Sequence, residues 1–241
     1  MGSTKSQRGP RDDVFLEEQF AAVQQRALAI EKSADLLAAW RAYRQLAASF
    51  ETLRDVSAIR AKAEELEKRK EFRDAEKRER NDFAEQARLS DEILSVASVK
   101  KSDNSSPTAA SDQAAMLTKE LRSRAEHEKK PERALVLKRA FGGVFIGSIE
   151  SGGDALDKKD YGLAARFFAC AAEANPESEW AFRNLAVARA LSGDRKGALE
   201  ALRSARKLTK DLLDFSNWLD HEPAFERFKK IADFDSLASS S

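Results

Sequence analysis

The sequence predicts an all-α protein, and three observations carry that prediction. No glycine or proline occurs between Arg11 and Ser106, where alanine, leucine, glutamate, arginine and lysine dominate, and this composition strongly favours helix. Apolar residues recur every three or four positions in several long segments, as amphipathic helices require. The C-terminal third has an internal period of 34 residues, which is typical of arrays of helix pairs.

Length and charge narrow the classes of function. The 241 residues are enough for one or two domains, and 42% apolar content is enough for a core. Lys plus Arg number 42 and Asp plus Glu 41, so the net charge is +1 and no large one-sided field is expected. This balance argues against nucleic acid or an anionic membrane as the main partner. No apolar run approaches the roughly 18–20 residues of a membrane span.

The N-terminus and the cysteine content leave the compartment open. The start, MGSTKSQRGPRDD, contains no apolar stretch of the kind found in signal peptides, and we predict a disordered tail over residues 1–11. A single cysteine, Cys170, excludes an internal disulfide. The localisation is therefore unknown: cytoplasmic if the chain is complete, exported if it is a fragment of a longer protein.

We predict that residues 12–99 form a long helical hairpin or coiled-coil-like region of antiparallel helices. Apolar residues spaced three and four apart run from Leu16 to Ile30 and again from Leu36 to Phe50, which predicts helices near 12–32 and 34–51. Ser33 is the expected N-cap of the second helix. A third helix is expected over 55–98.

The 55–98 helix is unusual because residues 67–82 contain only three uncharged residues. Acid-first pairs four residues apart, such as Glu65 with Arg69 and Glu76 with Arg80, favour an exposed helix. Its apolar seam is interrupted in the middle, so a coiled coil is not favoured. We therefore predict a monomer or a weak dimer through this helix.

A serine-rich stretch separates this region from the rest. Residues 100–112, KKSDNSSPTAASD, predict a linker, and residues 113–144 are expected to form connecting helices. Pro131 suits the first turn of a helix, where its missing N–H costs nothing.

The 34-residue period relates two consecutive segments. The matched pairs are Gly152 and Ala186, Ala164 and Ala198, Phe168 and Leu202, and Ala171 and Ala205. In each segment an aspartate, Asp160 or Asp194, stands just before the second helix. The pattern resembles the tetratricopeptide repeat, a helix–turn–helix unit with small residues where its helices cross. The resemblance covers 145–210 and implies two repeats, although Ser148 and Ser151 replace the large apolar residues usual in the first.

The stretch FGGVFIGSIESGGD, residues 141–154, also has the glycine spacing of a phosphate-binding loop. The lysine and the preceding strand of such a loop are missing, so a nucleotide site is not expected. We expect Gly152 where two helices approach most closely, and Gly142, Gly143 and Gly147 at a kink or at a close contact with a neighbouring helix.

Residues 211–241 are expected to form a helical cap and tail. Five apolar residues should cover the last repeat, because the end unit of an array has no neighbour to bury its apolar face. They are Leu212, Leu213, Phe215, Trp218 and Leu219. The whole layout also resembles the helical accessory region of some large bacterial multidomain proteins, including hydrolase-type ones.

No catalytic, metal or cofactor site is expected. His127 and His221 have no partner at helical spacing, and Cys170 lies among alanines with no histidine near in sequence.

The resemblance implies that the first helices of the repeats form a concave face that binds a protein or peptide partner. On that face we predict Trp180, Arg183, Asn184 and Val187 from the second repeat, and Ile146 and Ile149 from the first. Residues 112–130 are the alternative occupant of this face. Ile149 and Gly153 replace basic or polar residues of a carboxylate clamp, so a chaperone-tail receptor is not expected. The predicted function is a non-catalytic interaction scaffold; the alternatives are a structural spacer and an accessory domain of an exported hydrolase.

Overall fold

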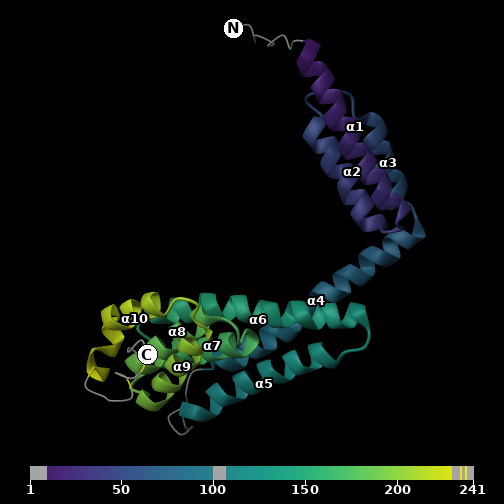
Figure 1. Ribbon diagram of the computed structural model, residues 1–241. Coiled ribbons are helices and arrows are strands. Elements are labelled where there is room, and N and C mark those ends of the chain that lie inside the picture. Colours follow the sequence, from purple (N-terminus) through teal and green to yellow (C-terminus); the bar gives the residue numbers. More distant parts are fainter. Residues whose placement is uncertain (1–9, 100–106, 230–233, 235–236, 238–241) are drawn as a thin grey trace. The chain divides into compact units, whose positions relative to one another are not determined.

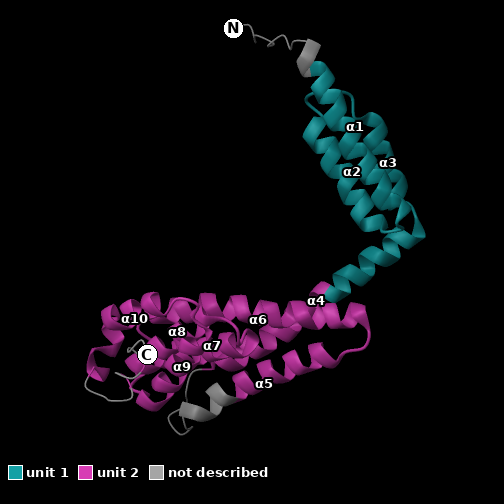
Figure 2. Ribbon diagram, viewed as in Figure 1, with its two compact units in different colours: residues 1–82 teal, residues 83–241 magenta. Residues whose placement is uncertain are grey.

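The computed structural model describes residues 10–99, 107–229, 234 and 237. Within these residues all regular secondary structure is helical, with ten α-helices, one 3-10 helix and no strand (Figure 1), so the all-α prediction is confirmed. The chain divides into two compact units, residues 1–82 and 83–241 (Figure 2). The boundary falls inside α4 (Lys70–Ser98), and therefore inside the 12–99 range predicted as one helical region.

Unit 1 is built from α1 (Pro10–Lys32), α2 (Leu36–Phe50), α3 (Ser57–Glu67) and the first part of α4. In it α2 packs against both α1 and α3. The largest fully buried side chains are Tyr43, Leu46 and Leu66, and the Phe20 ring meets the Phe50 ring edge-on at 5.2 Å. The apolar stripes seen in the sequence thus form one core.

The turn between α1 and α2 differs from the prediction. The N-cap of α2 is Asp35, whose carboxylate accepts a hydrogen bond of 3.0 Å from the backbone N–H of Ala38, and not Ser33. The Ser33 hydroxyl instead donates to the carbonyl of Ile30 at 2.7 Å. Ala34 takes a φ of 65° between them. The three residues between α1 and α2 must reverse the chain direction. Ala34 does so with a left-handed conformation, and the N-cap of α2 therefore lies at Asp35, two positions after Ser33.

The single helix predicted over 55–98 is wrong, because α3 ends at Glu67 and α4 begins at Lys70. Neither glycine nor proline marks the break. Leu66 and Phe72 are both buried, the latter against the ring of Trp40 at 5.7 Å. Six residues apart, they would point about 120° away from each other on a straight helix. The break at Lys68 and Arg69 lets both side chains be buried within unit 1, so packing overrides helix propensity.

Most residues of the interrupted apolar seam, through which a weak dimer was predicted, are buried inside the two units. Six seam residues are buried: Val56, Ile59, Ala63, Leu66, Ile93 and Ala97. Phe83 is exposed. Association through this segment stays a prediction.

Glu31 joins three helices of unit 1 through a polar network. Its carboxylate accepts a hydrogen bond of 2.8 Å from the Tyr43 hydroxyl, and lies 3.1 Å from Lys62 Nζ and 3.6 Å from Arg69 Nη2. Burial opposes ionisation of Glu31, but the hydrogen bonds from Tyr43 and Lys62 outweigh it and lower its pKa. Burial, together with the bond to Glu31, raises the pKa of Tyr43 to about 12.

We expect unit 1 to lose stability at alkaline pH because of Tyr43. A folded-state pKa above the ordinary value of 10.0 means that this contribution is complete below pH 10 and is lost as the pH rises toward about 12. A spectrophotometric titration of tyrosinate should show one of the two tyrosines ionising late, and Tyr43→Phe should remove that late phase. A native protein whose entire tyrosinate signal develops around pH 10 would contradict this.

Unit 2 contains the rest of α4 and six further α-helices with a 3-10 helix. These are α5 (Pro107–His127), α6 (Pro131–Asp157), α7 (Tyr161–Ala174), α8 (Glu179–Ser192), α9 (Arg195–Leu208), α10 (Leu212–His221) and η1 (Pro223–Phe228). Helix α7 packs against α6 and α8, α8 packs against α9, and α5 packs against α6 and α7.

The observed helix bounds also differ from the predicted segments. Helix α5 begins inside the stretch 100–112 that was predicted as a linker, while 100–106 and 1–9 lie outside the described residues. Pro131 occupies the first turn of α6, as predicted. That helix runs without interruption through the expected boundary at 144/145.

The 34-residue period of the sequence is also a period of burial. Every matched pair is buried: Gly152 and Ala186, Ala164 and Ala198, Phe168 and Leu202, and Ala171 and Ala205. Asp160 and Asp194 cap α7 and α9 in the same way, each accepting from the backbone N–H three residues on, at 3.2 and 2.9 Å. The repeated sequence thus produces a repeated local structure.

Three of the five glycines of α6, Gly143, Gly147 and Gly152, lie where a neighbouring helix approaches, whereas a Cβ at Gly142 or Gly153 would meet nothing within 4 Å. A Cβ at Gly147 would lie 2.7 Å from Leu94 Cδ1 of α4, and one at Gly152 would lie 2.9 Å from Phe168 Cζ of α7. The close approach predicted at Gly152 is confirmed. Residues 142–148 are continuous helix, whose interior N–H groups serve the helix itself, so they form no phosphate-binding loop.

The aromatic cap forms, but with fewer residues than expected. Phe215 and Leu219 of α10 are buried with Phe225 and Phe228 of η1 and with Phe234. The prediction that Leu212 and Leu213 cover the last repeat is wrong, since they are 44% and 69% exposed.

Candidate functional site

The predicted binding face contains two large apolar side chains that the protein leaves open. Ile146 of α6 is 59% exposed and Trp180 of α8 is 49% exposed. The ring of Phe168 lies against Gly152 of α6 and meets the Trp180 ring edge-on at 6.0 Å. The Phe168 ring therefore packs against Trp180, while about half of the Trp180 side chain stays accessible.

Arg183 has a different environment from the one expected of a binding anchor. Only 17% of its side chain is exposed, and its Nη2 lies 2.5 Å from Glu179 and 2.9 Å from Asp214 of α10. The guanidinium also lies 4.7 Å from the Trp218 ring and 5.3 Å from the Phe215 ring. Arg183 thus connects α8 to the aromatic cap.

The other predicted face residues are partly buried. Ile149 and Val187 pack against the core shared by α6 to α10. Asn184 donates from Nδ2 to the Trp180 carbonyl at 2.9 Å. Among the six predicted face residues, Ile146 and Trp180 are therefore the two whose side chains are exposed.

The alternative that residues 112–130 cover the predicted face does not apply to Ile146 and Trp180. Helix α5 packs against α6 and α7, and the two side chains remain exposed. Arg122 of α5 instead donates to the carbonyl of Glu173 in α7.

Cys170, His127 and His221, the candidate catalytic or metal-binding residues of the sequence, lie on three different helices, α7, α5 and α10. Cys170 is completely buried, and burial raises its pKa to about 11, so its thiol stays protonated at neutral pH. The rings of His127 and His221 each bond a backbone carbonyl one turn earlier in their own helix. Among the residues that the structure describes, no three His, Cys, Asp or Glu side chains are grouped to hold a metal ion.

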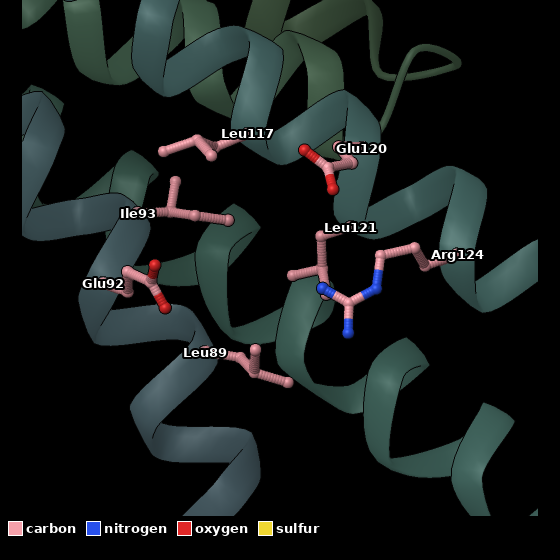
Figure 3. A pocket seen from close by; sticks show the side chains of 7 residues that line it. All are labelled: Leu89, Glu92, Ile93, Leu117, Glu120, Leu121 and Arg124. Atoms are coloured by element: carbon pink, nitrogen blue, oxygen red, sulfur yellow. The ribbon is translucent and has the colours of Figure 1, made fainter.

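A small pocket that the sequence did not predict lies between α4 and α5, with a volume of about 140 Å³ (Figure 3). Its apolar lining consists of Leu89, Ile93, Leu117 and Leu121, and its charged lining of Glu92, Glu120 and Arg124. Arg88 lies 3.3 Å from Glu92. With both signs of charge present, the lining favours no particular class of ligand.

A cluster of cationic side chains on α9 was also not predicted from the sequence. Arg203, Arg206 and Lys207 line a second pocket with Leu212 and Leu237. Their spacing of three and four residues in the sequence was the available signal.

The comparisons with other proteins add no family assignment. No protein-family model matches the chain, and neither the curated proteins nor the solved structures contain a match. None of the described helices is both long and apolar enough to span a bilayer.

Proposed function

We propose that this protein is a non-catalytic interaction scaffold, in which tetratricopeptide-like helix pairs bind a segment of a partner protein across α6 and α8. The observation that supports the proposal most is the pair of exposed apolar side chains, Ile146 and Trp180. Tryptophan is enriched among residues that dominate binding energy, and a fixed ring loses little entropy on binding.

Two further features favour this proposal. The 34-residue recurrence of buried positions makes α6 to α9 a repetitive helical stack, an architecture that offers extended surfaces. Leaving Ile146 and Trp180 in water forgoes part of the roughly 1.5–3 kcal/mol that burial of a large apolar side chain provides. A partner that covers both side chains would recover that free energy.

A spacer is the second candidate, and α4 favours it. This helix of 29 residues belongs to both compact units, and at about 1.5 Å per residue it is roughly 43 Å long. Much of its charged first half lies exposed. A spacer requires no partner at Ile146 or Trp180.

Site-specific photo-crosslinking in the source cells tests the proposal. We expect a benzophenone side chain at position 146 or 180 to capture the same polypeptide. Ile146→Glu should lower the yield at position 180 about fivefold, because a charge in an apolar contact costs at least ~1 kcal/mol. Mass spectrometry would identify the captured polypeptide.

The matched control is the same probe at Met116 of α5, which is 70% exposed and lies outside the proposed face. Products shared by all three positions would report surface encounters alone and would refute the proposal. The absence of any product at 146 and 180 would favour the spacer.

A further inference from the structure

The side of α6 that faces away from the rest of unit 2 carries a regular series of residues, which we call the outer face of α6. Seven positions spaced three or four apart lie within an arc of about 80°, at roughly 100° per residue, and span about 33 Å. None of the seven is buried, and the two large apolar ones, Leu135 and Ile146, are 46% and 59% exposed. The seven residues are Leu135, Arg139, Gly142, Ile146, Glu150, Gly153 and Asp157.

The two glycines of the outer face have no packing reason within the protein. A Cβ at Gly142 or Gly153 would meet nothing within 4 Å, and neither residue takes a positive φ. Glycine in a helix interior costs up to about 1 kcal/mol relative to alanine. Elsewhere in α6, at Gly147 and Gly152, a glycine lies where a neighbouring helix approaches. Gly142 and Gly153 therefore leave the outer face open to the close approach of a further helix.

The charged residues of the outer face are exposed, and their side chains have no partner. Arg139, Glu150 and Asp157 make no side-chain hydrogen bond or ion pair with any residue that the structure describes. Elsewhere on α6, in contrast, Arg133 pairs with Glu85 of α4. The cation lies in the N-terminal half of the outer face and both acids lie in the C-terminal half. A ligand that satisfies these charges therefore carries both signs, in the opposite order along α6.

A second copy of α6, running antiparallel, has that order. The spacings of the seven residues are 4, 3, 4, 4, 3 and 4, which read the same in both directions about Ile146. A two-fold axis at Ile146 therefore places each residue of the outer face opposite another residue of the same set. Gly142 lies opposite Glu150 of the second copy, and Gly153 lies opposite Arg139 of the second copy. Each glycine thus leaves room for one long charged side chain.

The charges favour the antiparallel direction. In this arrangement each Arg139 lies about one helical turn along the axis from both Glu150 and Asp157 of the second copy. A parallel arrangement in register would bring the two Arg139 side chains together and oppose like acids, which repel. The direction of the pair is therefore set by charge, and its centre by the apolar side chain of Ile146.

We propose that this protein forms an antiparallel dimer through the outer face of α6. Ile146 packs on Ile146 of the second copy, Leu135 lies over Gly153 of the second copy, and Arg139 pairs with the acids. The dimer goes beyond the scaffold function and does not rest on it, because no residue of α8 takes part. It covers Ile146, so a second copy and a partner protein compete for that residue.

The test is sedimentation equilibrium of the full chain. We expect a dimer with a Kd of about 10–100 μM, a weak value because one helix face buries less than the ~1,600 Å² of a standard interface. Salt should weaken the dimer. Arg139→Glu should raise the Kd at least about tenfold, because attraction to two acids in each half becomes repulsion. A chain that sediments only as a 26.8 kDa monomer at about 1 mM would overturn the proposal.

A pair of oppositely charged variants tests the interface and the folding together. Arg139→Glu makes all charges of the outer face negative, and Glu150→Lys combined with Asp157→Lys makes them all positive. Neither variant should self-associate, but an equal mixture should form a heterodimer at least as tight as the unaltered dimer. A misfolded variant could not restore association in this way. A mixture that stays monomeric would contradict the proposed pairing.

Lys119→Glu is the matched control, since Lys119 is exposed on α5 and the change in net charge is the same. It should alter the Kd by less than about twofold, as surface changes away from an interface do. Equal losses with Lys119→Glu and Arg139→Glu would reduce the effect to net charge and overturn the proposal. Trp180→Ala separates the dimer from the scaffold function: it should leave the dimer unchanged, and a lost dimer would contradict the pairing through α6.

Discussion

Gly152→Leu is expected to lower the free energy of unfolding of unit 2 by about 2–3 kcal/mol. A Cβ at this position would lie 2.9 Å from Phe168 Cζ, 3.0 Å from Cε1 and 3.1 Å from Cε2. The ring cannot move away cheaply, because Phe168 is buried and meets Trp180 edge-on. Forced overpacking of a core costs typically ~1–3 kcal/mol. Urea titration followed by circular dichroism would measure the shift.

Gly153→Leu is the matched control, because a Cβ there meets nothing within 4 Å. Leucine has the higher helix propensity, so this change should be neutral or stabilising by up to roughly 0.8 kcal/mol. A double-mutant cycle with Phe168→Ala gives a second check. That change alone should cost ~3–5 kcal/mol, and the new leucine should refill part of the cavity. Strict additivity would show that Gly152 and Phe168 do not form the close contact.

Arg183→Ala is expected to detach the aromatic cap locally and to cost about 2 kcal/mol. The substitution removes an ion pair to Glu179, one to the exposed Asp214, and contacts with the rings of Phe215 and Trp218. The exposed pair contributes only ~0–1 kcal/mol, and the ring contacts contribute ~0.5–1 kcal/mol each. Hydrogen exchange should accelerate in α10 and η1 and stay unchanged in α5.

Two variants separate the contributions at Arg183. Lysine keeps the charge but lacks the planar fork, so Arg183→Lys should give an intermediate loss. Asp214→Asn should cost less than about 1 kcal/mol, since that carboxylate is 64% exposed. If Arg183 were a partner anchor as the sequence indicated, Arg183→Ala would leave exchange in α10 unchanged and would weaken photo-crosslinking at position 180.

Much of the fold follows from local pattern. Three kinds of local signal predicted parts of the fold, and each depends only on residues within a few positions. They are the periodic apolar residues of α1 and α2, the N-caps Asp160 and Asp194, and Pro131 at the start of α6. Such features are readable because capping and amphipathicity act within one or two turns of helix. The break after Glu67 was not readable, because it depends on the contact of Phe72 with Trp40, far away in sequence.

The candidate site shows the same division. Trp180 and Ile146 were predicted to bind a partner from residue type and repeat position; both are exposed, and binding there stays a prediction. The environment of Arg183 depends on α10, and the exposure of Leu212 and Leu213 depends on the direction in which α10 starts. Neither can be derived from a residue type.

The sequence by itself determined that this protein is helical, that buried positions recur every 34 residues, and that Gly152 meets a neighbouring helix. Only the tertiary structure decided where the charged helix breaks, which apolar residues stay in water, and which arginine serves the core. The physical reason is range: helix propensity and caps act between near neighbours, whereas burial and ion pairing depend on segments that only folding brings together.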